Sequence, residues 1–365
     1  MENNKLFLNT AFLYILIKLF GTFFALYIFN YFTPLVDSKL YIEGYYAESL
    51  VLDYANFFRT LFIQNITTFL VSMTNPFITH SVFSLFSGIG ILILSYSMKS
   101  KLILVLLLFP SALVWTSIVG KEAIYYGCVT VILAIWSIQI SDYRKRKNVA
   151  LHLGCSLMLI VCLVLRPHYT IPLIYILSTS FVLYTFTAKK LKAILIFIIF
   201  TSIIALIIYM MIFMPQDLIA RGLGAIDPQS RASRFEYFNM NHLDPNLVYS
   251  KTLILKEGIF GIIGPFPSEL LVRLEFIPFF IEGILILILP IFFGFILQKT
   301  QNYHLYKKYF YIALIPAILM SILIHAPFGI LNPGTAIRWR VNFELIFYAF
   351  PLILYLLSKN KKFDE

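Results

Sequence analysis

Charged residues are scarce in this chain of 365 residues: Asp, Glu, Lys and Arg make up 13% of it, while 60% is hydrophobic. Mean hydropathy is +0.84. A soluble domain could not cover so much apolar surface with so few charges. Runs of 17 or more apolar residues recur along the chain, and each is long enough to cross roughly 30 Å of hydrocarbon as a helix. The composition excludes a soluble protein and predicts an all-α, polytopic membrane bundle.

Cysteine is also rare, and the three cysteines (Cys128, Cys155 and Cys162) all lie inside apolar runs. Their spacing matches neither a disulfide framework nor a metal site, so we interpret them as small core residues. The chain lacks a Walker sequence, an HExxH motif and a His/Cys cluster, and the isolated Gly-Leu-Gly at 222–224 is no dinucleotide signature. These absences exclude a self-powered ATP-driven pump and predict a protein without metal or cofactor.

The apolar runs predict ten membrane spans within a single membrane domain, 1–365, at about 8–31, 76–98, 102–118, 123–140, 150–166, 170–187, 193–214, 276–298, 308–325 and 342–358. With the N-terminus inside, the inside segments hold 16 Lys and Arg against four acidic residues. This asymmetry follows the positive-inside rule and predicts that both termini are cytoplasmic. The net charge of +11 is therefore a topology signal and does not indicate nucleic-acid binding.

The segments predicted to lie outside include two long loops, 32–75 and 215–275, which we expect to carry short helices. Long loops in a compact fold are usually functional, so we expect the function on the outer face. Apolar residues between 50 and 62 recur at helical spacing, which predicts a helix along the outer interface or a packing element. Asp37 precedes it, where its carboxylate could face the membrane surface.

Two short outer segments also carry charge. In FPSALVWTSIVGKEAIYYG, Pro110 predicts a kink in the span, and Lys121 and Glu122 form the tip. This tip is either an exposed ion pair of little energetic value or a functional group held inward. In LVLRPHY, Arg166 either extends to the outer headgroups or binds an anion, and His168 follows two residues later.

The remaining candidates are arginines. Arg231 and Arg234, in the second long loop, would share a helical face as a solvated basic helix or as a phosphate clamp. Arg338 and Arg340 follow a turn signal, Asn-Pro-Gly at 332–334, in a short outer segment. Burying an unpaired charge beside hydrocarbon is costly, so we expect both to face headgroups or an anionic substrate.

Taken together, these residues predict a cationic pocket at the outer leaflet with one or two carboxylates. Such a pocket suits a lipid-linked phosphate, with Lys121 and the arginines binding diphosphate or sugar. Asp37, Glu122 or His168 would align or deprotonate the attacking hydroxyl.

The segments FPSALVWTSIVGKEAI, LVLRPHY, GPFPSE and NPGTAIRWR resemble those of the Wzy-type O-antigen or capsular polysaccharide polymerases, which look like C-type (GT-C) membrane glycosyltransferases. The resemblance implies polymerisation of undecaprenyl-diphosphate-linked oligosaccharide repeat units at the periplasmic face of a bacterial inner membrane, as in lipopolysaccharide biosynthesis. It also implies that the reaction needs neither a metal nor a nucleotide sugar. The partners that it implies are membrane lipids, a flippase and a chain-length regulator. Arg231 and Arg234 match the loop arginines of such polymerases best, and Asp37 is placed like the catalytic acid of C-type enzymes. The chain lacks the paired acids of the metal-using members, so the base assignment stays open.

Two other functions remain. A glycosyltransferase of the same architecture could add one sugar from a polyprenyl-phosphate donor, and would need an acidic base more strictly. A transporter or flippase would need charged residues inside the bilayer, for which Lys18 and Glu282 are the candidates.

Overall fold

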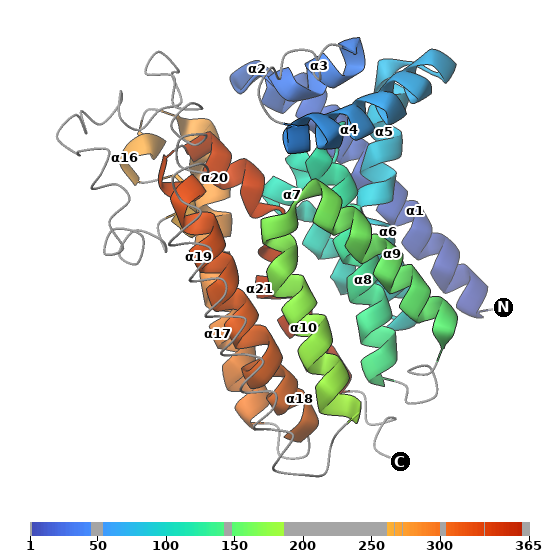
Figure 1. Ribbon diagram of the computed structural model, residues 1–365, viewed down its shortest axis with the longest axis vertical. Helices are drawn as coiled ribbons and strands as arrows, with labels where there is room; N and C mark the ends of the chain where they lie inside the picture. Colours follow the sequence, from blue (N-terminus) through green and yellow to red (C-terminus); the bar gives the residue numbers. More distant parts are fainter. Residues whose placement is uncertain are drawn as a thin grey trace. The chain divides into compact units, whose positions relative to one another are not determined.

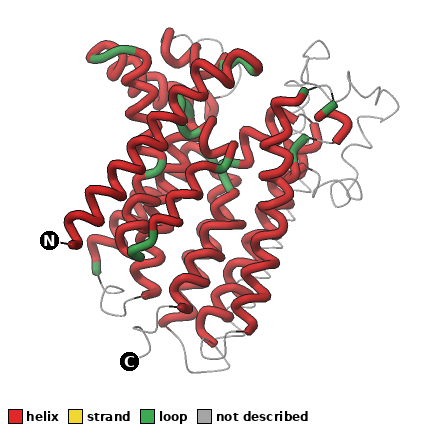
Figure 2. Tube along the Cα trace, turned by 180° about the vertical axis from the view of Figure 1, so that it is seen from behind, coloured by secondary structure: helices red, strands yellow, loops and turns green. Residues whose placement is uncertain are grey.

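A computed structural model describes residues 2–44, 54–141, 148–185, 261–265, 267–271, 273–299, 304–331 and 333–359. Every secondary-structure element in these residues is helical (Figures 1 and 2). The chain divides into two compact units, Met1–Thr170 (unit 1) and Ile171–Lys362 (unit 2), and it passes from one to the other within α10.

Within the described residues, five helical stretches are long and apolar enough to cross a membrane: Phe7–Phe32, Lys121–Ser141, Leu274–Lys299, Tyr306–His325 and Ala336–Lys359. A sixth arises if the bent pair Pro76–Ser87 and Ile89–Ser97 forms one span. The chain is thus a helical membrane protein, while the expected number of ten spans stays a prediction. The expected span 193–214 lies outside the described residues.

Unit 1 is built around one central helix. Its elements are α1 (Glu2–Phe23), η1 (Phe24–Phe29), α2 (Asn30–Phe32), α3 (Val36–Glu43), α4 (Tyr54–Met73), α5 (Pro76–Ser87), α6 (Ile89–Ser97), η2 (Lys101–Leu108), α7 (Pro110–Trp115), α8 (Lys121–Ser141), α9 (Val149–Leu165) and the start of α10 (Pro167–Thr185). Nearly all of α8 is buried, and α4, α5, α6 and α9 pack against it. By contrast, α1 and α9 expose large apolar side chains such as Phe12 and Leu153, which suits helices facing lipid.

The contact between α6 and α8 depends on a glycine. A Cβ atom on Gly90 would lie 2.0 Å from the backbone carbonyl of Thr130. The Thr130 hydroxyl also accepts a hydrogen bond from the Gly90 N–H at 3.3 Å. The absence of a side chain at Gly90 therefore sets how closely the two helices approach.

The segment 102–118, expected as a span kinked at Pro110, is not one regular α-helix. The chain forms the 3₁₀ helix η2, then the short helix α7, and then a buried turn at 116–120. Pro110 is the physical cause, because a residue that precedes proline avoids the α conformation, and Phe109 has φ −57° and ψ 131°. The kink predicted at Pro110 is confirmed as a complete break in the helix.

The first predicted outer loop contains two helices. α3 ends at Gly44, whose φ of 81° is the left-handed conformation that glycine adopts readily. α4 confirms the predicted helix and is longer than expected, with 20 residues. Its Phe58 and Phe69 are 64% and 60% exposed, and α3 packs along it. These exposed rings suit a helix that meets lipid or headgroups.

Unit 2 comprises the rest of α10, then α16 (Pro267–Leu270), η5 (Leu274–Phe276), α17 (Ile277–Lys299), α18 (His304–Lys308), η6 (Tyr309–Leu314), α19 (Ile315–Leu331), α20 (Pro333–Arg340) and α21 (Glu344–Lys359). α17 and α21 pack along each other. A Cβ atom on Gly283 would lie 2.1 Å from the carbonyl oxygen of Ile263, so residues 261–265 lie directly against α17. The segment 326–341, expected as a short outer loop, is mostly helical, and Pro333 begins α20.

Candidate functional site

Four of the residues predicted for the site belong to two neighbouring segments of unit 1. Lys121 and Glu122 form the first turn of α8, and Arg166 and His168 flank the junction of α9 and α10. Pro167 keeps Arg166 out of the helical conformation, and Arg166 has φ −146° and ψ 69°. The backbone N–H of Arg166 donates a hydrogen bond to the Cys162 carbonyl and so caps α9. The break at Pro167 thereby turns the Arg166 side chain out of the regular pattern of α9.

Arg166 and Glu122 form an ion pair across this junction. The Nη2 group of Arg166 donates a hydrogen bond to Oε1 of Glu122. The two side chains are only 10% and 2% exposed. This contact shows that Glu122 is not part of an exposed surface pair, because its side chain is buried and bonds to Arg166, while a functional role of the tip stays a prediction.

A third segment contributes to the electrostatics of this place. Burial, together with the guanidinium groups of Arg166 and Arg59, lowers the pKa of His168 from 6.5 to about 3. The imidazole is therefore neutral at physiological pH and can accept a hydrogen bond. Arg59 lies on α4, and in Figure 1 α3 and α4 lie across the end of unit 1 at which α9 finishes.

We call Arg59, Lys121, Glu122, Arg166 and His168 the α8–α9 cluster. It contains three basic side chains, one carboxylate and one neutral imidazole. Arg166 and Glu122 are buried, and the other three side chains are half-buried. Basic side chains outnumber the carboxylate among these five residues, a composition suited to binding an anion.

The turn at 116–120 is held in place by buried polar groups. Lys18, which is fully buried in α1, donates hydrogen bonds to the Thr116 hydroxyl at 2.8 Å and the Ser117 hydroxyl at 3.3 Å. The Val119 N–H donates to Nδ1 of His80 at 2.9 Å. These contacts fix the backbone that leads directly into Glu122.

Gly120 completes this support. A Cβ atom at this position would approach Oε2 of Glu122 to 3.2 Å, closer than most such contacts in proteins. The side-chain-free position therefore leaves room for the carboxylate. The bonds of Lys18 to the two hydroxyl groups also show that its ammonium group lies in the interior and does not extend to the headgroups.

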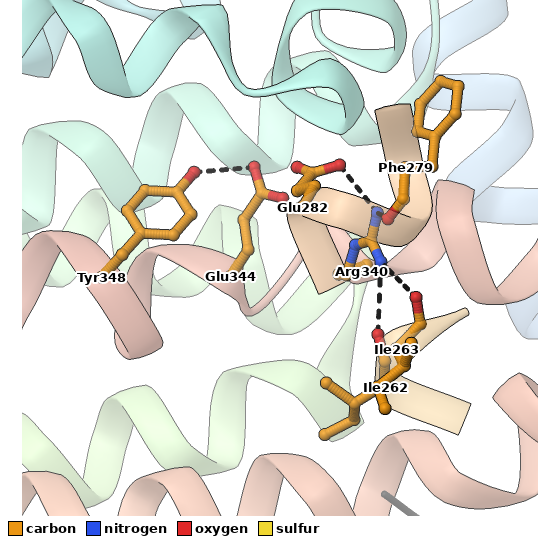
Figure 3. A network of polar contacts seen from close by, with 7 residues as sticks. All are labelled: Ile262, Ile263, Phe279, Glu282, Arg340, Glu344 and Tyr348. Atoms are coloured by element: carbon orange, nitrogen blue, oxygen red, sulfur yellow. Dashed lines mark hydrogen bonds and ion pairs between the residues drawn. The ribbon is translucent and has the colours of Figure 1, made fainter. Parts of the chain in front are cut away.

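A second charged network lies inside unit 2 (Figure 3). Arg340 is fully buried, and its Nη2 group donates to Oε2 of Glu282 at 2.7 Å and to the Phe279 carbonyl at 2.9 Å. Its Nη1 group donates to the carbonyls of Ile262 and Ile263 at 3.2 and 2.9 Å. Arg340 thus cross-links residues 261–265, α17 and α20. Its predicted role in diphosphate binding stays a prediction, and it would require these bonds to be exchanged.

The other predicted site residues have separate positions. Arg338 is half-buried on α20, and Asp37 is half-buried in the first turn of α3. Because α3 packs along α4, Asp37 and Arg59 are on neighbouring helices. Arg231 and Arg234 lie outside the described residues.

Sequence reasoning did not identify Arg59 or Glu344, and it considered Lys18 only for transport. A lysine in the middle of an apolar run was a signal that Lys18 has interior partners. Arg59 offered no such signal, because its position on a half-exposed helix is typical of a solvated side chain.

The α8–α9 cluster can bind an anionic group with its cations, and it places a carboxylate and a neutral imidazole beside them. In the part of the chain that the structure describes, no group of three His, Cys, Asp or Glu side chains could hold a metal ion. No protein-family model, no curated protein and no solved structure matches this sequence.

Proposed function

We propose that this protein is a membrane glycosyltransferase that polymerises undecaprenyl-diphosphate-linked oligosaccharide repeat units into O-antigen or capsular polysaccharide. The reaction would occur at the outer face of a bacterial inner membrane. The observation that carries the proposal is the α8–α9 cluster, in which segments far apart in the sequence bring basic side chains and a neutral imidazole together with a buried carboxylate. A lipid-linked diphosphate has the complementary charge.

In the proposed reaction, the bond between the anomeric carbon of the growing chain and its diphosphate breaks. A new bond forms between that carbon and a hydroxyl oxygen of the incoming repeat unit. Arg59, Lys121 and Arg166 stabilise the negative charge that grows on the diphosphate, an effect worth about 3 kcal/mol per donor in other enzymes. The hydroxyl proton passes to the departing diphosphate or to solvent, and the neutral imidazole of His168 accepts a hydrogen bond from the hydroxyl group and aligns it.

Glu122 has a positioning role in this scheme. Its pairing with Arg166 holds the guanidinium group at the junction of α9 and α10. Asp37 and the arginines at 231, 234 and 338 are further candidates for substrate contacts, and neither metal nor nucleotide sugar is required. A chain-length regulator and a flippase are the proposed partners.

A transporter or flippase is the second candidate, and a specific observation favours it. Lys18 is 0% exposed and Glu282 is 1% exposed, so charged groups lie inside apolar helices. Such groups mark ion or substrate pathways in many membrane proteins. The third candidate, transfer of a single sugar from a polyprenyl phosphate, uses the same cluster with a smaller leaving group.

Deletion of the gene from its host distinguishes these three functions. If the protein is a polymerase, the cell surface carries single repeat units in place of long chains. If it adds one sugar, the lipid-linked units lack one residue, and if it is a flippase, complete units accumulate on the cytoplasmic side. Long chains that persist in the deletion strain would exclude the proposal.

Variants of the cluster then test the site. We expect Arg166→Gln and Lys121→Gln to give single-repeat surface units when they are expressed in the deletion strain. The matched control is Glu43→Gln, because Glu43 and Lys39 form an exposed pair on α3 with side chains 43% and 76% exposed. Long chains in both cluster variants, at normal protein levels, would exclude the assigned site.

A further inference from the structure

Among the residues of unit 2 that the structure describes, the buried side chains carry more acidic than basic groups. Glu282 on α17 and Glu344 on α21 are 1% and 0% exposed, and Arg340 on α20 is 0% exposed. We call Glu282 and Glu344 the acid pair. Two ionised carboxylates with one guanidinium would leave one uncompensated negative charge inside apolar helices, which costs several kcal/mol.

Within the described residues, Arg340 donates a hydrogen bond directly to one member of the acid pair. Its Nη2 group donates to Oε2 of Glu282 at 2.7 Å, and its other Nη bonds go to backbone carbonyls. Carbonyl groups accept hydrogen bonds but carry no net charge, so these bonds do not change the balance between the two carboxylates and the one guanidinium group. Glu282 and Arg340 therefore form a neutral pair, and Glu344 is the excess acid.

Within the described part of the chain, one of the two carboxyl oxygens of Glu344 lacks the hydrogen-bond donor that an ionised carboxylate would need. Oε1 accepts a hydrogen bond from the Tyr348 hydroxyl at 2.9 Å. Oε2 is buried and has no hydrogen-bond partner among the residues that the structure describes. Figure 3 shows the carboxyl groups of Glu344 and Glu282 side by side. An ionised oxygen in this place would face a second carboxylate with no donor between them, whereas a protonated one would donate to it.

We propose that the acid pair is a proton-binding site, in which Glu344 is protonated and its Oε2–H donates to Glu282. The ligand is a single proton. The proposal does not rest on the proposed sugar transfer, because it uses none of the residues of the α8–α9 cluster. Loss of the proton would place a net negative charge between α17 and α21, two helices that pack along each other.

The elements packed around α21 contribute few other titratable groups. Arg340 comes from α20 and Glu282 from α17, as described above. η6 contributes the buried Tyr309, and α19 contributes the buried His325, whose ring lies 4.7 Å from that of Phe343. Among the fully buried side chains that the structure describes on these elements, His325 could supply a second positive charge if it were protonated, so a variant of His325 belongs in the test.

Infrared spectroscopy of the purified full chain in lipid nanodiscs tests the proposal, because a protonated carboxyl group has a C=O stretch that shifts in deuterium oxide. At neutral pH we expect one such band from a buried carboxyl group. Glu344→Gln removes it because the protonated group is gone. Glu282→Gln also removes it, because Glu344 then becomes the ionised partner of Arg340. Each Gln variant keeps a side chain of the same shape, and thermal melting checks that it is folded.

Two control variants should leave the band unchanged. Glu122→Gln removes a buried carboxylate that is already paired one to one with Arg166. His325→Gln tests whether a second cation balances the acid pair, and loss of the band only in this variant would overturn the proposal. A wild-type protein without the band, or a band that survives in both acid-pair variants, would also overturn it. If the band is absent and sodium chloride stabilises the protein more than potassium chloride, the site holds a sodium ion and not a proton.

Discussion

At the scale of residues, two buried Arg–Glu pairs look alike but differ in the charges around them. Beside Arg166 and Glu122 lie the further cations Arg59 and Lys121, whereas beside Arg340 and Glu282 lies the further acid Glu344. A pair with surplus cations can bind an anion, and a pair with a surplus acid can bind a proton. The neighbours of each pair, and not the pair itself, therefore distinguish the two networks.

The pair of Glu122 and Arg166 has a structural role and a proposed functional role, and a double substitution distinguishes the two roles. Glu122→Leu alone leaves a buried, uncompensated guanidinium group, so we expect the free energy of unfolding to fall by about 3–5 kcal/mol. Glu122→Leu combined with Arg166→Met restores most of that loss, because both buried charges are gone. Thermal melting in detergent measures the stability, and the length of surface polysaccharide measures activity.

We expect the double variant to be stable but to make no long chains. A stable double variant that makes long chains would show that the pair serves only the fold. A double variant as unstable as Glu122→Leu would contradict the charge argument.

The neutral state of His168 predicts a loss of stability in acid. Its pKa is about 3 in the folded protein and 6.5 ordinarily, so between these values the unfolded chain binds a proton that the folded chain does not. The contribution of His168 is therefore fully present above pH 6.5 and is lost progressively as the pH falls toward 3. His168→Asn should reduce the fall in melting temperature between pH 7 and pH 4.5. His152→Asn, on α9, controls for the removal of one histidine, and equal slopes in all three proteins would contradict the prediction.

The sequence predicted the residue types of the cluster but not their contacts. Charge beside helix ends at Lys121, Glu122, Arg166 and His168 was visible, because prolines and apolar runs mark those ends. The contact between Glu122 and Arg166 was not, because 44 residues separate them and spacing alone does not reveal which helices pack together. The acid pair was hidden for the same reason, since Glu344 reads as the polar start of an apolar helix.

At the scale of elements, hydropathy predicted where the chain is apolar and helical but not how each helix is built. The 102–118 run is apolar throughout, yet η2 and α7 divide it at Pro110. Hydropathy does not distinguish a 3₁₀ from an α hydrogen-bonding pattern, whereas Pro110 gave the position of the break. This break matters for the site, because the turn that follows α7 leads into Glu122.

Close helix packing gives a prediction at the same scale. Gly90→Ala places a methyl group 2.0 Å from the Thr130 carbonyl, so α6 and α8 must separate, and we expect a loss of about 1–3 kcal/mol. Gly154→Ala on α9 is the matched control, since its Cβ would make an ordinary 3.7 Å contact with Ile135. Melting temperatures of the two variants measure the difference. An equal effect of both substitutions would show that close approach at Gly90 does not limit the packing.

At the scale of the whole molecule, the distribution of charge predicts an orientation across the membrane. Lysine dominates the segments assigned to the inside, such as 299–308 and 359–362, and the α8–α9 cluster lies in segments assigned to the outside. The proposed reaction depends on this orientation, because repeat units are polymerised on the outer face. An inverted chain would present the same cluster to the cytoplasm, where nucleotide sugars are available and a lipid-linked donor would not be required.

Cysteine labelling tests this orientation. We expect Lys39→Cys on α3 to react with a membrane-impermeant maleimide in cells whose outer membrane has been permeabilised, and Lys307→Cys on α18 to react only after lysis. Both positions replace lysines on short helices, and the Lys39 side chain is 76% exposed. The native Cys128 and Cys162 are buried, which keeps the background low. Cys155 is half-buried on α9, so each variant also carries Cys155→Ser. If Lys307→Cys is labelled in intact inner membranes and Lys39→Cys is not, the cluster faces the cytoplasm. Polymerisation at the outer face would then be physically impossible for this chain, whatever the cluster binds.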